Sequence, residues 1–81
     1  MQVTVRLFAG VREAAGTSTV EVEVPARPFV SDIRRALSIL LPQATELLRC
    51  SAMAVDGEYA QDITPVVAGS EVAVIPPVSG G

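Results

Sequence analysis

Met1-Gln-Val-Thr-Val-Arg-Leu-Phe8 alternates between apolar and polar side chains from one residue to the next. Successive side chains of a β-strand point to opposite faces of a sheet, so this alternation predicts a half-buried strand. Val3, Val5 and Leu7 share its buried face, and the polar residues share the other face. The sequence therefore begins with a strand that lies at the surface of a hydrophobic core.

The segment 18–24 alternates in the same way, with its valines on one face and Glu21 and Glu23 on the other. Together the two segments predict an antiparallel hairpin with a long connection. Residues 10–16 in that connection predict one helical turn, which is ended by Gly16. The outward glutamates discourage pairing with the sheet edge of another molecule.

The middle of the chain predicts one main helix. Pro25 and Pro28 end the second strand, and Ser31 or Asp32 then caps a helix that runs through Leu41. A shorter helical piece follows at 43–49, after Pro42. The apolar stripe of the main helix consists of Ile33, Ala36, Leu37 and Leu40. Its solvated face carries Arg34 and Arg35.

Two further strand signals complete the sheet. Ala52–Val55 and Glu58–Ala60 flank Asp56-Gly57, a strong two-residue turn signal, and predict a second hairpin. After a loop, Glu71–Ile75 predicts the last strand. The order is that of an α+β fold of the β-grasp (ubiquitin-like) type, a mixed sheet with one main helix in which the first and last strands are parallel. We expect residues 1–75 to form this domain.

Val72-Ala-Val-Ile-Pro-Pro-Val-Ser-Gly-Gly81 leads out of the last strand. The two prolines fix φ and stop the strand, so 76–81 is expected to leave as a flexible, extended tail. Gly80 and Gly81 lack a Cβ atom, so they present a bare carboxylate that fits a narrow slot in another protein. A frayed terminus or a linker is the plainer interpretation of a Gly-Ser-rich end, although a linker would not normally follow a valine-rich strand through a double proline.

Phe8 and Ile75 are expected at the end of the sheet from which the tail leaves. If Val72 and Val74 face the helix, Phe8 and Ile75 share the outer face and form a small apolar docking patch. The alternative is that Phe8 folds back over the rim and closes the core. The predicted partner-binding residues are Phe8, Ile75, Pro76, Pro77, Val78 and Ser79, the last two through backbone pairing with a partner's groove.

Composition limits the chemistry of the 81 residues. Six arginines and nine acidic residues give a net charge of −3. A protein that binds nucleic acid needs a basic face, so nucleic acid is not a predicted partner. The chain has no histidine and a single cysteine, Cys50, so neither a metal site nor a bound cofactor is predicted. No paired carboxylates, nucleophile–base pair or phosphate loop appears, so any catalytic groups are expected on a partner.

Cys50 cannot form a disulfide within the chain, which suits a reducing compartment. No signal peptide or membrane-spanning run is present, so we expect a cytoplasmic protein that does not associate with membranes. We interpret Cys50, beside Leu47 and Leu48, as a small apolar filler of the core.

Three segments resemble the small subunit of molybdopterin synthase, and together they reach from one end of the sequence to the other. Leu7-Phe-Ala-Gly-Val-Arg-Glu-Ala-Ala-Gly16 is similar to the family's Phe-Ala-x-x-Arg-Glu-x-x-Gly opening. Ala54-Val-Asp-Gly-Glu-Tyr59 resembles its middle hairpin, and Glu71–Gly81 resembles its tail with the double proline. Asp56 where the family more often has Asn, and Gly69-Ser-Glu71 in place of Gly-Asp-Glu, lie in turns that tolerate either residue.

The resemblance implies a ubiquitin-like sulfur carrier of molybdenum cofactor biosynthesis. In that family an E1-like adenylating enzyme uses ATP to activate the C-terminal glycine, here Gly81, and a persulfide donor converts the acyl-adenylate to a thiocarboxylate. The tail then enters the large molybdopterin synthase subunit, where Gly80 gives steric clearance, and sulfur passes to cyclic pyranopterin phosphate. The resemblance places the catalytic residues on the large subunit, and whether the carrier alone counts as an enzyme stays open.

Three alternatives remain open from the sequence. A carrier of the same fold can serve cysteine, thiamine or tRNA thiolation, although thiamine-type carriers usually lack the double proline. A protein modifier would form isopeptide bonds through Gly81. A β-grasp interaction module would make no use of the Gly-Gly end.

Overall fold

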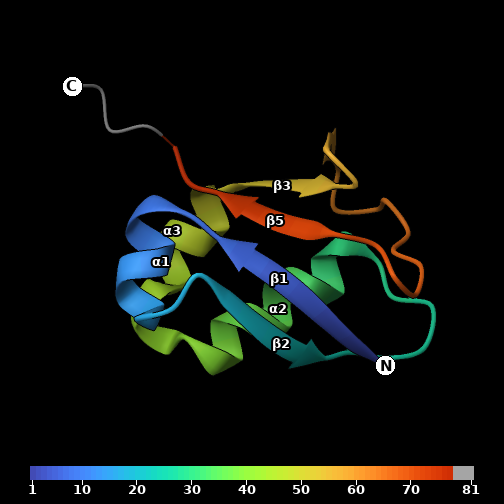
Figure 1. The fold of residues 1–81 in the computed structure, drawn as a ribbon, viewed down its shortest axis with the longest axis horizontal. Coiled ribbons are helices and arrows are strands. Elements are labelled where there is room, and N and C mark those ends of the chain that lie inside the picture. The colour runs from blue at the N-terminus through green and yellow to red at the C-terminus, as the bar shows by residue number, and fades with distance from the viewer. Residues whose placement is uncertain (78–81) are drawn as a thin grey trace.

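A computed structural model describes residues 1–77. Five strands form one mixed sheet in the order β2-β1-β5-β3-β4, and the helices lie together on one side of it (Figure 1). The predicted α+β fold of the β-grasp type, with one main helix, is confirmed. In chain order the elements are β1 (Gln2–Leu7), α1 (Ala9–Ala15), β2 (Thr19–Glu23), α2 (Val30–Leu40), the 3-10 turn η1 (Pro42–Ala44), α3 (Thr45–Cys50), β3 (Ala52–Val55), β4 (Glu58–Ala60) and β5 (Val72–Ile75).

The pairing of the strands follows the predicted order. β1 pairs antiparallel with β2 and parallel with β5, with Leu7 opposite Val74. β3 pairs antiparallel with both β4 and β5, with Met53 opposite Val74. The first and last strands therefore lie side by side at the centre of the sheet and run in the same direction (Figure 1). The predicted parallel pairing is confirmed.

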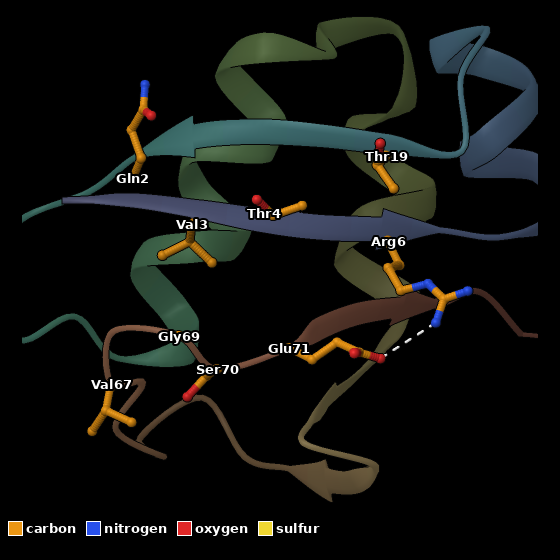
Figure 2. Close-up of a pocket in the computed structure, with 9 residues that line it drawn as sticks. All are labelled: Gln2, Val3, Thr4, Arg6, Thr19, Val67, Gly69, Ser70 and Glu71. Carbon is orange, nitrogen blue, oxygen red and sulfur yellow. Dashed lines mark hydrogen bonds and ion pairs between the residues drawn. The ribbon is translucent and has the colours of Figure 1, made fainter.

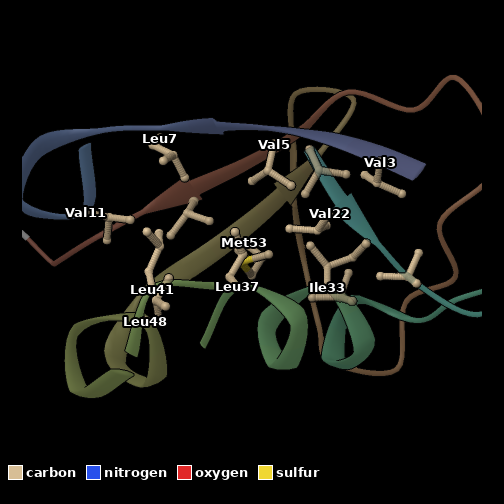
Figure 3. Packing of buried hydrophobic residues seen from close by; sticks show 14 of the residues in the cluster. Val3, Val5, Leu7, Val11, Val22, Ile33, Leu37, Leu41, Leu48 and Met53 are labelled. Carbon is tan, nitrogen blue, oxygen red and sulfur yellow. The ribbon is translucent and has the colours of Figure 1, made fainter. Parts of the chain in front are cut away.

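The core lies between the sheet and the helices (Figure 3). β1 shows the strict alternation of buried and exposed residues that its sequence predicts. Val72 and Val74 of β5 are completely buried, so the last strand also presents its valines to the helices. The buried cluster consists of Val3, Val5, Leu7, Val11, Val22, Val24, Val30, Ile33, Leu37, Leu41, Ala44, Leu48, Met53, Val66, Val72 and Val74.

Glycine is suited to two turns of this fold because the backbone there has positive φ. α1 is longer than the single turn predicted, and Gly16 ends it in the left-handed conformation with φ 74°. Its N–H donates to the carbonyl of Arg12 over 2.9 Å. In the β3–β4 hairpin both Asp56 and Gly57 have positive φ, 51° and 84°, which is the backbone of a type I′ turn. Asp-Gly is therefore a correct hairpin signal here.

The main helix begins earlier than predicted. Val30 is the first residue of α2 and Phe29 is its N-cap, so the prediction that Ser31 or Asp32 caps the helix is wrong. Asp32 acts from the first turn instead, where its carboxylate accepts the N–H of Phe29 over 2.8 Å. The buried Pro28 and the bridge between Phe29 and Pro65 fix the entry of the chain before either polar residue is reached.

Leu40 does not belong to the buried stripe of α2. Val30, Ile33 and Leu37 are completely buried, whereas Leu40 is 50% exposed. Spacings of three and four residues keep one side of a helix facing the core, and Leu41, just past the helix end, continues that series. Leu40 lies beside the stripe, so its predicted position in the core is wrong.

Arg34 is not solvated, contrary to prediction. Its guanidinium donates to the carbonyls of Leu48 and Ser51 over 2.6 and 2.8 Å. It also pairs with the carboxylate of Asp62 at 3.2 Å. Carbonyls at a helix end lack partners within the helix, so Arg34 holds the end of α3 to α2. Arg35, the next residue, is exposed as predicted.

Cys50 is exposed, so its interpretation as a core filler is wrong. It is the last residue of α3, and Leu48 occupies the buried position of that helix instead. None of the helices within residues 1–77 is long and apolar enough to cross a bilayer.

We expect Arg34→Met to lower the free energy of unfolding by about 1–3 kcal/mol, because it removes the side-chain donor to two partly buried carbonyls at the end of α3. Arg35→Met is the matched control, one residue away and exposed, and should change that free energy by less than about 0.5 kcal/mol. Urea unfolding of both variants measures the difference. Equal effects would show that the contacts of Arg34 do not hold the two helices together.

Candidate functional site: the tail exit and the open face of the sheet

The last strand ends at the edge of a face of the sheet that none of the helices in residues 1–77 covers (Figure 1). β5 lies between β1 and β3 and ends at Ile75. Pro76 is buried, so only Pro77 of the predicted pair presents its ring to solvent. The other predicted tail residues, Val78, Ser79, Gly80 and Gly81, lie outside the described residues. The chain therefore approaches its Gly-Gly sequence from the centre of the sheet.

Small and apolar side chains occupy the open face beside this exit. In the sheet register Ala52 stands opposite Ile75, and Ala54 stands opposite both Ala73 and Tyr59. Their neighbours Met53 and Val74 face the helices, so these residues face away from them. We call this set the exit face: Phe8, Ala52, Ala54, Tyr59, Ala73 and Ile75.

Phe8 stands at the margin of the exit face and does not close the core. It directly follows β1, level with Ile75 at the end of β5, because Leu7 is paired with Val74. Its side chain is 40% exposed, and Ile75 is half-buried. Both residues are therefore accessible on the surface, and the alternative in which Phe8 folds over the rim is wrong. Docking of a partner on them stays a prediction.

Arg6 holds a defined position beside Phe8. Its guanidinium carbon lies 5.8 Å from the centre of the Phe8 ring, within the range of a cation–π contact. The same guanidinium pairs with the carboxylate of Glu71 at 3.3 Å (Figure 2). Both charged groups are more than half exposed, so the pair orients Arg6 more than it stabilises the fold.

Glu71 is also joined to the second hairpin. Its N–H donates to the Asp56 carboxylate over 2.9 Å, and its carbonyl accepts the N–H of Asp56 over 2.8 Å. A carboxamide oxygen at position 56 would accept the same hydrogen bond. Asp in place of the family's Asn is therefore compatible with this turn.

A polar hollow on the open face lies beyond Arg6, between β1 and the loop before β5. It has a volume of about 490 Å³, and its lining includes Gln2, Thr4 and Ser70 (Figure 2). Its one guanidinium and one carboxylate, on Arg6 and Glu71, are already paired with each other. Within residues 1–77 no group of three His, Cys, Asp or Glu side chains is placed to hold a metal ion.

Sequence reasoning found Phe8 and Ile75 but missed Ala52, Ala54 and Tyr59. The missing information was the register, which sets these residues beside Ala73 across three strands. The alternation in Ala52-Met-Ala-Val55 was the available signal, because it places two alanines on the face opposite Met53.

Arg12 and Glu13 are exposed on α1, away from this face, and they form no ion pair with each other or with another residue in 1–77.

Comparison with known proteins assigns the chain to one family. The family model described as the ThiS family matches residues 5–81. The molybdopterin synthase sulfur carrier subunit of Dictyostelium discoideum is 37% identical, over 99% of this chain and 96% of its own length. Relatives from three other organisms carry the same name at 31–32% identity.

Solved structures share the fold over the whole chain. SAMP1 from Haloferax volcanii is 31% identical, covers 100% of both chains and has a TM-score of 0.87. A chain in the complex of subunits 1 and 2 of molybdopterin-converting factor from Helicobacter pylori covers 100% of both chains, with 23% identity and a TM-score of 0.69. At that identity the second likeness concerns the fold alone.

Adjacent residues at the end of β1 should differ sharply in their effect on stability. Leu7→Ala removes a side chain that is 1% exposed and should lower the free energy of unfolding by about 2–5 kcal/mol. Phe8→Ala removes a partly exposed ring and should lower it by only about 1 kcal/mol. Thermal or urea unfolding measures both. A loss for Phe8→Ala as large as that for Leu7→Ala would mean that Phe8 is a core residue.

Proposed function

Because this chain belongs to the ThiS family, we propose that it is the sulfur carrier subunit of a molybdopterin synthase. The observation that carries the proposal is similarity along the whole chain to several relatives with that one name. The position of β5 supports it, because the strand that precedes the Gly-Gly sequence is held at the centre of the sheet beside an open apolar face.

The reactive group in this proposal is a free carboxylate on Gly81. A terminal carboxyl has a pKa of roughly 3.3–3.7, so it is ionised at neutral pH and is a poor electrophile. Attack of its oxygen on the α-phosphorus of ATP releases pyrophosphate and makes an acyl-adenylate. A persulfide sulfur then displaces AMP, and a second thiol breaks the sulfur–sulfur bond of the acyl disulfide, leaving the thiocarboxylate. Gly80 keeps the approach to this carbon free of side chains.

The proposed partners are an E1-like adenylating enzyme and the large synthase subunit. Each must admit the tail, with Val78 and Ser79 offering backbone groups to a groove. The exit face gives either partner an apolar surface next to the tail. The Helicobacter pylori structure contains subunit 1 of molybdopterin-converting factor in complex with subunit 2, which is the kind of assembly we propose for this chain.

The chain itself supplies the reactive end and the docking surface. ATP is used by the adenylating enzyme and is not held here as a cofactor. Catalytic groups for sulfur transfer to cyclic pyranopterin phosphate are proposed on the large subunit. A cytoplasmic location stays a prediction.

A second candidate function is protein modification. SAMP1 of Haloferax volcanii, which matches this chain at 31% identity, is a small archaeal modifier protein. A modifier would use the same activated Gly81, but a lysine amine of another protein would displace AMP. The two functions therefore share activation and differ in the nucleophile that accepts the acyl group.

Incubation with ATP, an active adenylating enzyme and a persulfide source should replace one oxygen of the chain by sulfur, measured as intact mass. Adding a large synthase subunit and cyclic pyranopterin phosphate should remove that sulfur. Deletion of Gly81 should abolish loading and leave the unfolding curve unchanged, since β5 ends at Ile75. Loading of the deleted chain would refute the role of Gly81, and linkage to lysines of other proteins would favour the modifier.

Phe8→Ala should weaken binding to the large subunit by about tenfold, because truncation of an aromatic anchor at an interface commonly removes more than about 1 kcal/mol. Phe29→Ala is the matched control, since Phe29 is 48% exposed but lies at the start of α2 and not on the exit face. Calorimetric titration of both variants measures the affinities. Equal weakening by both would argue against docking through the exit face.

A further inference from the structure

An apolar groove lies between β2 and α2, at the side of the molecule away from β3 and β4. Its volume is about 380 Å³, and Val22, Ala36, Ile39 and Leu40 give it an apolar floor and wall. Ile39 is 76% exposed and Leu40 is 50% exposed. Two consecutive large aliphatic side chains at the end of α2 are therefore exposed to solvent and contribute little to the core.

The opposite wall of the groove is the free edge of the sheet. In the sheet that residues 1–77 form, β2 is the outermost strand and has β1 as its one neighbour. Val24 and Met1 exchange both of their main-chain hydrogen bonds, at 2.9 Å each. Inward and outward groups alternate along an antiparallel strand, so Val22 also bonds to β1. The main-chain N–H and C=O of Glu21 and Glu23 consequently point away from the sheet.

We propose that this groove binds an extended segment of a partner protein, which adds to β2 as a further strand and alternates apolar with basic side chains. Main-chain hydrogen bonds to Glu21 and Glu23 would hold the segment in register. Every second side chain of the added strand faces the helix and packs on Ile39 and Leu40. The intervening side chains lie on the open side of the sheet, level with the two glutamates.

Charge determines which partner suits the groove. Glu21 forms no ion pair with any residue in 1–77, whereas Glu23 pairs with the Met1 ammonium at 2.9 Å. Glu21 is therefore the main charge available to select an arginine or lysine on the added strand. A second copy of this chain is a poor occupant, because pairing two β2 strands would bring their glutamates together.

The groove is separate from the exit face. β1 lies between β2 and β5 in the sheet order, and the groove is lined by residues of β2 and α2. The exit face lies on the side of the sheet away from the helices, which lie together on the other side (Figure 1). A partner can thus be held on β2 while the tail is engaged elsewhere. The inference does not rest on the proposed function.

The test uses the full chain and a synthetic peptide, Arg-Ile-Arg-Val-Arg-Ile-Arg, with Glu-Ile-Glu-Val-Glu-Ile-Glu as the control peptide. We expect the basic peptide to bind and to slow hydrogen exchange at the amides of Glu21 and Glu23, followed by NMR. The amide of Val22, which already bonds to β1, should change little. Failure to bind at millimolar peptide, equal binding of the acidic peptide, or protection at β4 in place of β2 would overturn the proposal.

Three variants distinguish binding of the peptide in the groove from nonspecific attraction between a basic peptide and an acidic protein. Ile39→Ser combined with Leu40→Ser should weaken binding of the basic peptide about tenfold, through loss of apolar contact. Glu21→Gln should weaken it severalfold. Ile63→Ser, an equally exposed aliphatic position in the loop between β4 and β5, is the matched control and should leave the affinity unchanged. Urea unfolding verifies that each variant is folded, and insensitivity to both groove variants would contradict the assignment.

Discussion

The parallel pairing of β1 with β5 is the contact on which the rest of this structure depends. It joins the two ends of the described chain at the centre of the sheet and links the first hairpin to the second. Val5, Val72 and Val74 are completely buried at this seam, and burial of each such side chain contributes about 1.5–3 kcal/mol. The same pairing brings Phe8 level with Ile75. One contact therefore fixes both the core and the exit face.

The strands and turns were predictable because their signals are local. Alternation in β1 and β2 assigns buried faces without any knowledge of the partner strand, and Asp56-Gly57 specifies a turn by its own backbone preference. The helix predictions failed where the outcome depended on distant residues. Leu40, Arg34 and Cys50 were misassigned because their surroundings are set by how α2 and α3 meet, and helical periodicity alone does not contain that information.

The candidate site shows the same division between local and distant information. Phe8 and Ile75 were found because the β-grasp order places the first and last strands together. Ala52, Ala54 and Tyr59 were missed, since they join the exit face only through the register of three strands. Alanines carry no chemical signal of their own. Because their side chains are small, they leave an apolar area of the sheet uncovered beside the end of β5.

The central position of β5 also has a consequence for quality control by proteases. A chain cut anywhere between β4 and Val72 loses the strand that joins β1 to β3, and the valines that faced it become exposed. We expect such a fragment to unfold, because its core loses the completely buried Val72 and Val74. Loss of the segment that leads to Gly81 by such a cut is thus coupled to loss of the sheet, which exposes the truncated copy to proteases, whereas a cut after Ile75 leaves every strand in place.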